Sequence, residues 1–167
     1  NEALLRVDDV KKNNWDILYA RGMAYERSNQ WEKAEKDLLK VLEFLPNQPE
    51  VLNYLGYTWI EQDYKINEAK DLIIKATKIR PKDPYIVDSL GWAYFKQGDL
   101  VEAEKYLSQA VSALPVNSVI QSHFGDLLAL SGRYREAVVA WLRALEGDGE
   151  GIDPVNIESK IRDARAK

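Results

Sequence analysis

The side chain best suited to acid–base chemistry at neutral pH is His123, because the chain has a single histidine and no cysteine. Asp126 follows three residues later, and a histidine beside a carboxylate can form half of an acid–base pair. No nucleophile at a recognisable spacing completes a catalytic set around these two residues. We therefore interpret His123 as a satisfied surface histidine or one that faces a binding groove, and we predict a protein that is not an enzyme.

Metal and cofactor chemistry has equally little support in the residue types. One histidine and no cysteine exclude cysteine metal sites, His-based metal sites and an HExxH motif. The glycine-rich acidic run at 147–151 superficially resembles a phosphate or calcium loop. It lacks the lysine of a phosphate loop and the spacing of a calcium loop. We interpret this run as a flexible, solvated loop, and we predict no metal and no cofactor.

The composition indicates a globular protein and argues against a nucleic-acid partner. The chain has 167 residues, of which 46% are hydrophobic and 30% are charged, and its net charge is -4. This balance is typical of a globular protein and gives no overall footprint for nucleic acid, so we expect no nucleic-acid partner. No apolar run approaches about 18 residues, so we expect no transmembrane segment. The first residues, NEALLRVDDVKK, lack the pattern of a signal peptide and an initiating Met, and we expect the chain to be part of a longer array.

The strongest pattern in the sequence is an internal repeat. Glycine recurs at spacings of 34, 35 and 34 residues, and alanine recurs at spacings of 35, 34 and 34 residues. Proline recurs at spacings of 35 and 34 residues. The recurring residues are Gly22, Gly56, Gly91 and Gly125, then Ala34, Ala69, Ala103 and Ala137, and finally Pro46, Pro81 and Pro115. A fixed period in this range is typical of stacked helix pairs. Glycine and alanine at these positions would let paired helices approach closely, because a larger side chain would wedge them apart.

Each repeat also has the apolar spacing of two amphipathic helices. In the third repeat Val87, Leu90 and Tyr94, followed by Ala103 and Leu107, are separated by threes and fours. Helices of about 12–15 residues are marginal on their own in water, so stacking must supply their stability.

The two ends of the array depart from this pattern. Arg21 takes the position that Leu90 holds in the third repeat, which predicts a locally exposed edge. After the acidic loop, Asp-Pro begins a last helix, for which we predict apolar contacts through Val155, Ile157 and Ile161.

Residues 15–146 resemble four tetratricopeptide repeats, a family with the pattern W-x2-L-G-x2-Y, then A-x3-F, then P. The resemblance implies an all-α fold, a right-handed α-solenoid of about four helix-turn-helix repeats with a C-terminal capping helix. We expect the end of a preceding repeat at 1–12, repeats at 15–48, 49–83, 84–117 and 118–149, and the capping helix at 152–167.

A narrower resemblance concerns the stretches VLNYLGYTWIEQ and NEAKDLIIKATKIRPKDPYIVDSLGWAYFKQGD, which are similar to repeat proteins of proteobacteria. These include envelope lipoproteins, one of which, in pseudomonads, scaffolds a carboxyl-terminal processing protease. The resemblance implies a bacterial protein of the periplasm or outer membrane, with the cytoplasm as the alternative. The lipid-bearing cysteine of a lipoprotein is not present in this sequence.

The family resemblance also implies a binding groove, because the first helix of each pair lines the concave face of such solenoids. The residues expected to line it are Tyr19, Met23, Asn53, Tyr57, Asp88, Trp92, Phe95, His123 and Asp126, with Glu26 and Tyr54 beside them. Exposed aromatic residues favour anchoring a peptide, and the side chains of Asn53 and Asp88 could form hydrogen bonds with its backbone. The acidic residues Glu26, Asp88 and Asp126 favour a cationic or neutral ligand. In the alternative interpretation, the aromatic rings pack against the neighbouring first helix.

The expected function is that of a non-enzymatic scaffold or adaptor that holds a peptide or protein partner, in an assembly or protease-recruiting complex of a bacterial envelope. A regulatory or substrate-recruiting fragment of a larger enzyme is the alternative, and self-association is a third hypothesis. Repeats that clamp the carboxylate terminus of chaperones carry lysine and asparagine at the fifth and ninth positions of the first helix. Tyr19 and Met23 take these places here, so we expect no such role.

Overall fold

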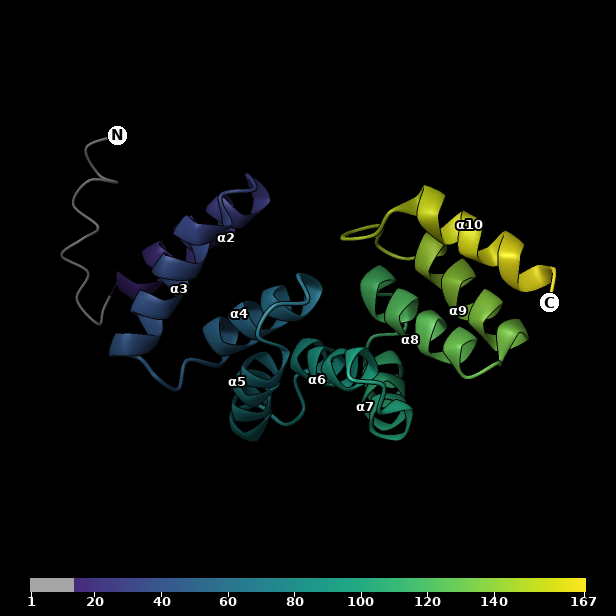
Figure 1. Ribbon diagram of the computed structural model, residues 1–167, viewed down its shortest axis with the longest axis horizontal. Helices are drawn as coiled ribbons and strands as arrows, with labels where there is room; N and C mark the ends of the chain where they lie inside the picture. The colour runs from purple at the N-terminus through teal and green to yellow at the C-terminus, as the bar shows by residue number, and fades with distance from the viewer. Residues whose placement is uncertain (1–13) are drawn as a thin grey trace. The chain divides into compact units, whose positions relative to one another are not determined.

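The computed structural model describes residues 14–167, which form helices joined by short turns and contain no strand (Figure 1). The helices are α2 (Trp15–Arg27), α3 (Trp31–Phe44), α4 (Pro49–Glu61), α5 (Ile66–Ile79), α6 (Pro84–Lys96), α7 (Leu100–Ala113), α8 (Ser118–Leu130), α9 (Tyr134–Glu146) and α10 (Pro154–Arg165). They fall into two compact units, Asn1–Ile79 with α2–α5 and Arg80–Lys167 with α6–α10. The predicted all-α helical repeat fold is confirmed. The preceding repeat expected at 1–12 lies outside the described residues.

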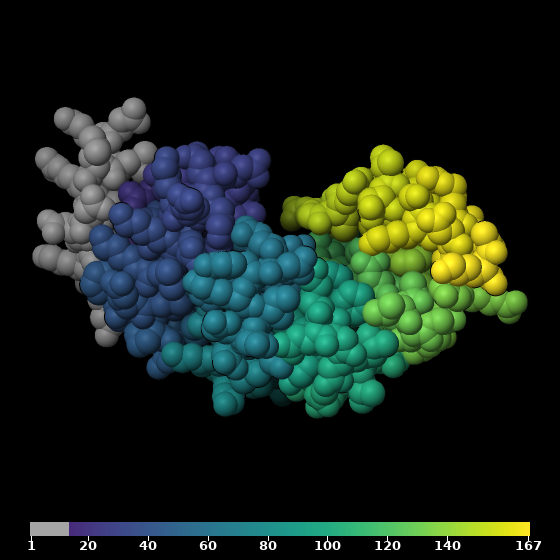
Figure 2. All heavy atoms as spheres, viewed as in Figure 1, coloured from purple at the N-terminus to yellow at the C-terminus, as the bar shows by residue number. Residues whose placement is uncertain are grey.

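Consecutive helices pack as pairs: α2 with α3, α4 with α5, α6 with α7, and α8 with α9. Side chains fill the spaces that the ribbons leave between paired helices (Figure 2). Each unit also contains a contact between pairs, because α3 packs against α4 in the first unit and α7 packs against α8 in the second. Within each unit, the second helix of the first pair therefore packs on the first helix of the next pair.

The recurring glycines lie where paired helices cross. A Cβ atom added to Gly91 would stand 2.7 Å from Leu107 Cγ and 2.9 Å from the Leu107 backbone nitrogen. A Cβ atom on Gly56 would stand 2.7 Å from Ile73 Cγ1 and 2.8 Å from a backbone oxygen of α5. The recurring alanines of the second helices are fully buried. Glycine and alanine thus recur in the sequence at the positions where the two helices of a pair approach each other most closely.

The turns between the helices of a pair need a residue with positive φ. Gly98 and Gly132 supply it in the second unit, with φ of 80° and 76°. Asn29 and Asp63 adopt φ of 56° and 49° in the first unit, as polar residues with short side chains tolerate best. Lys65, with φ of 45°, is a second residue with positive φ in the turn between α4 and α5, which is one residue longer than the others.

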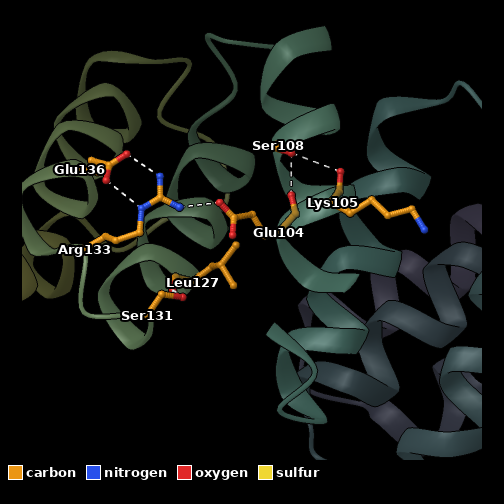
Figure 3. Close-up of polar contacts among 7 residues, drawn as sticks. All are labelled: Glu104, Lys105, Ser108, Leu127, Ser131, Arg133 and Glu136. Atoms are coloured by element: carbon orange, nitrogen blue, oxygen red, sulfur yellow. Dashed lines mark hydrogen bonds and ion pairs between the residues drawn. The ribbon is translucent and has the colours of Figure 1, made fainter. Parts of the chain in front are cut away.

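An arginine network links adjacent second helices in the second unit (Figure 3). Arg133, at the start of α9, donates to Glu104 of α7 and, through two nitrogens, to Glu136 of its own helix. The guanidinium lowers the pKa of Glu136, because it stabilises the carboxylate form. The network adds a polar contact between the third and fourth pairs beside their apolar packing.

Repeat one replaces an apolar contact with an ion pair. The Arg21 guanidinium of α2 donates to both oxygens of Asp37 in α3, at 2.6 and 2.7 Å. Asp37 is only 5% exposed, so this bidentate bond satisfies a buried carboxylate. Arg21, from which the sequence predicts an exposed edge, thus links α2 and α3 of the first pair.

The last helix covers the end of the fourth pair, although one of its predicted contacts is wrong. Ile157, Ile161 and Ala164 of α10 are buried against α9 and α8, in a cluster that includes Trp141. Val155, the third predicted contact, is 72% exposed. Two residues of separation turn a helix by about 200°, so Val155 and Ile157 cannot share one buried face.

Residues 148–151 of the acidic loop are exposed, as expected of a solvated loop, but the loop is also hydrogen-bonded to the N-terminus of α8. Asp148 accepts hydrogen bonds from the Ser118 backbone N–H at 3.2 Å and the Asn117 side chain at 3.0 Å. The Gly149 N–H donates to Ser118 Oγ at 2.8 Å. The loop therefore satisfies donors at the N-terminus of α8.

We predict that Gly91→Ala lowers the free energy of unfolding by about 1–3 kcal/mol, the usual cost of overpacking. The matched control is Gly22→Ala. Its Cβ would meet the flexible Leu38 side chain at 3.2 Å and no backbone atom closer than 3.5 Å, and it should change stability by less than about 1 kcal/mol. Urea denaturation of the two variants measures the difference. Equal effects would show that the close crossing at Gly91 is not a constraint.

We predict that Asp148→Asn lowers the Tm at neutral pH and has no effect at about pH 2. The N–H of Ser118 holds the pKa of Asp148 below its usual value. A lowered folded-state pKa gives stability that is present above the unfolded value of about 3.9 and is lost as the pH falls through the folded value. Thermal scans at the two pH values, with Asp163→Asn on α10 as control, test this. A Tm difference that persists in acid would contradict the assignment.

Candidate partner-binding surface

In the first unit, the expected groove residues lie on the first helices α2 and α4. Tyr19 of α2 meets Tyr54 of α4 edge to face, with ring centroids 5.7 Å apart and planes at 87°. The Tyr54 hydroxyl donates to Glu26 Oε2 at 3.0 Å. Burial raises the pKa of Tyr54, and the bond to Glu26 raises it further, so the hydroxyl stays protonated at neutral pH. These contacts join the two first helices through an aromatic pair and one carboxylate.

The other expected residues of this unit are partly exposed. Met23, Asn53 and Tyr57 are each half-buried. Asn53 Oδ1 is itself buried and has no hydrogen-bond partner among residues 14–167. A buried acceptor without a donor lowers the stability of the fold at this point.

In the second unit, Asp88, Trp92 and His123 are buried and pack against one another. Asp88 and Trp92 of α6 are 4% and 8% exposed, and His123 of α8 is 6% exposed. His123 Nδ1 lies 2.9 Å from Asp88 Oδ2, and the carboxylate oxygen accepts a hydrogen bond from the ring N–H. The other oxygen, Asp88 Oδ1, is buried with no hydrogen-bond partner in the described part of the chain.

Two rings stack on Trp92. The His123 ring lies 4.0 Å from it, centroid to centroid and 12° from parallel, and the Phe95 ring lies 4.6 Å away at 10°. We call Asp88, Trp92, Phe95 and His123 the α6–α8 stack. Since so little of Trp92 is exposed, its contacts fit the alternative in which rings fill the space between neighbouring first helices.

Asp126 has other partners. Its carboxylate accepts hydrogen bonds from Trp141 Nε1 at 3.0 Å and from Lys160 Nζ of α10 at 2.8 Å. The carboxylate at the His123 imidazole is therefore Asp88 and not Asp126, the neighbour in sequence. The repeat holds the missed signal: Asp88 and His123 are one period and one residue apart, which makes them neighbours on adjacent first helices.

The described part of the chain holds no cluster of three or more His, Cys, Asp or Glu residues arranged to bind a metal. Between residues 14 and 167, no helix has both the length and the apolar character needed to cross a membrane.

We predict that Trp92→Ala lowers the free energy of unfolding by about 3–5 kcal/mol, the usual cost of truncating a buried aromatic residue. Tyr85→Ala is the control on the same helix, since Tyr85 is 57% exposed, and it should change stability by no more than about 0.5 kcal/mol. Chemical denaturation measures both. A negligible loss for Trp92→Ala would instead make this ring available to a partner.

Comparison with known proteins identifies the repeats. Models of the tetratricopeptide repeat match residues 15–48 and 89–154. The TPR repeat-containing protein PA4667 of Pseudomonas aeruginosa is 40% identical over 111 residues, which are 66% of this chain and 19% of that protein. The chain thus matches about a fifth of the length of that relative.

Solved structures share the fold at lower sequence identity. The crystal structure of MamA superposes with a TM-score of 0.66 at 20% identity and covers 91% of this chain and 81% of that one. The Pseudomonas aeruginosa PilF structure gives 0.67 at 18% identity, over 91% and 72%. The Sgt2 TPR domain of Aspergillus fumigatus gives 0.62 at 20% identity, over 71% and 78%. With its paired helices, its glycine and alanine period and these matches, the chain is a tetratricopeptide repeat protein.

Proposed function

We propose that this chain is a non-enzymatic scaffold that holds a peptide or protein partner on the first-helix surface of α2 and α4. The tetratricopeptide repeat is in general a protein-interaction fold, and proteins of this kind are typically not enzymes. The observation that carries the proposal is a row of partly exposed apolar and aromatic side chains along these helices.

The chemistry of this surface indicates the kind of partner. Tyr19, Met23 and Tyr57 offer apolar area that a partner side chain could cover, as aromatic residues do at many interfaces. Glu26 brings a negative charge, and its carboxylate accepts a hydrogen bond from the neutral Tyr54 hydroxyl. We therefore propose a neutral or cationic segment as the ligand.

The acidic residues of the second unit contribute less to this preference. Asp88 faces His123 and is buried, and Asp126 is neutralised by Lys160. Of the three carboxylates expected to shape the groove, Glu26 is the one that we propose acts on a partner. The α6–α8 stack then serves to hold α6 and α8 together.

The setting that we propose is a complex in a bacterial envelope that assembles proteins or recruits a protease. The support is the likeness in sequence to proteobacterial repeat proteins, including the Pseudomonas relative. A second candidate is a regulatory or substrate-recruiting part of a larger enzyme. The match covers only 19% of the Pseudomonas relative, so a protein of that length would have room for an enzyme domain outside the matched repeats.

We predict that Met23→Ala with Tyr57→Ala weakens capture of the partner at least tenfold, which corresponds to about 1.4 kcal/mol. The measurement is a pull-down from Pseudomonas envelope and cytosolic extracts with wild type and variants of equal Tm. The control is Val101→Ala with Val139→Ala, two exposed residues of the second helices α7 and α9. Loss of the partner with the control pair, and retention with the first pair, would move the site to the second helices.

A further inference from the structure

The first turn of α9 and the end of α10 border an open cavity whose lining is mostly basic. The cavity has a volume of about 700 Å³, and its lining includes Arg133, Arg135, Arg165 and Lys167, together with the carboxylate of Glu136. The chain as a whole has a net charge of -4, so this cavity reverses the overall sign of the charge. A local excess of cations in an acidic chain indicates a preference for an anionic ligand.

Two of these arginines are available to a ligand. Arg133 is already occupied, because its guanidinium donates to Glu104 and Glu136 (Figure 3). Arg135 and Arg165 are exposed, and neither forms an ion pair within the described part of the chain. An arginine can donate two parallel N–H groups to one carboxylate, so each of these side chains can hold an acidic group.

The rest of the lining fits a peptide better than a lone inorganic ion. Tyr134 and Val138 are partly buried and line the cavity, and the Lys167 ammonium lies 4.8 Å from the Tyr134 ring centroid. The volume is typical of a pocket that holds a ligand with several side chains or functional groups. Helix α9 begins without a side-chain cap, so its dipole would stabilise a carboxylate near its first N–H groups. A segment that combines carboxylates with an apolar side chain satisfies all of these features.

We propose that this cavity binds an acidic segment of a protein partner. Arg135 and Arg165 pair with carboxylates of the segment, and Tyr134 contacts one of its apolar side chains. The proposal goes beyond the surface of α2 and α4, for which we propose a neutral or cationic ligand. The two units of the chain would then hold segments of opposite charge.

Fluorescence anisotropy with a short amidated peptide of glutamate and leucine tests the proposal directly. The reference probe is the same peptide with glutamine in place of glutamate. The wild type should bind the glutamate peptide at least tenfold more tightly, and added salt should weaken this binding by screening the charges. Arg135→Gln with Arg165→Gln should weaken it at least tenfold. Equal binding of the two peptides by the wild type would overturn the proposal.

The matched control is Arg143→Gln with Arg162→Gln. These arginines are also exposed and lie on the same two helices, and their replacement removes the same charge, but they do not line the cavity. The control should bind the glutamate peptide as the wild type does. An equal loss in both variants would overturn the proposal, in favour of a general positive field.

A single-stranded DNA oligonucleotide distinguishes an acidic peptide from nucleic acid. Binding of the oligonucleotide that is tighter than that of the glutamate peptide, and that is lost in Arg135→Gln with Arg165→Gln, would also overturn the proposal. Weaker binding of the oligonucleotide supports an acidic peptide as the ligand. None of these measurements involves α2 or α4, so a failure here would not bear on the proposed scaffold function.

Discussion

The close crossing of paired helices is the constraint on which the rest of the structure depends. The helices are 12 to 14 residues long and would be marginal alone in water. They are stable because Gly56 and Gly91 let one backbone approach the side chains of the next helix within a few ångströms. That packing sets which side of each first helix is buried, and so which side chains are left for a partner.

Polar contacts differentiate the repeats that share this common core. Repeat one joins its helices through Arg21 and Asp37, where later repeats have apolar residues. In the second unit, Asp88 and His123 connect adjacent first helices, and Arg133 connects adjacent second helices. The Arg21–Asp37 and Asp88–His123 pairs are largely buried. Such pairs add little net stability over apolar packing, but an unmatched member is costly, so these two pairs favour one register of stacking. The same fold thus offers a more open first-helix surface in one unit and a packed one in the other.

The repeat period predicted the helical elements well, because glycine, alanine and proline at fixed spacings report backbone geometry directly. It was less informative about side chains, since position on a first helix does not tell whether a ring meets a partner or the next repeat. Trp92 illustrates this, because its burial depends on His123, which lies in a different repeat. Asp148 lies in the loop that ends the last repeat, and Val155 lies beyond it. No repeat period guides the prediction at either residue, so local hydrogen bonds and helix phase decide the outcome.

The most direct test of the account is site-specific photo-crosslinking in cells of a pseudomonad. A photoreactive amino acid replaces Tyr57 on the first helix α4 in one chain, and Val101 on the second helix α7 in another. Val101 is the more exposed of the two, so simple accessibility favours it. The account predicts a discrete protein adduct from position 57 and none from position 101. Adducts from position 101 alone would contradict the assignment of the partner surface to the first helices.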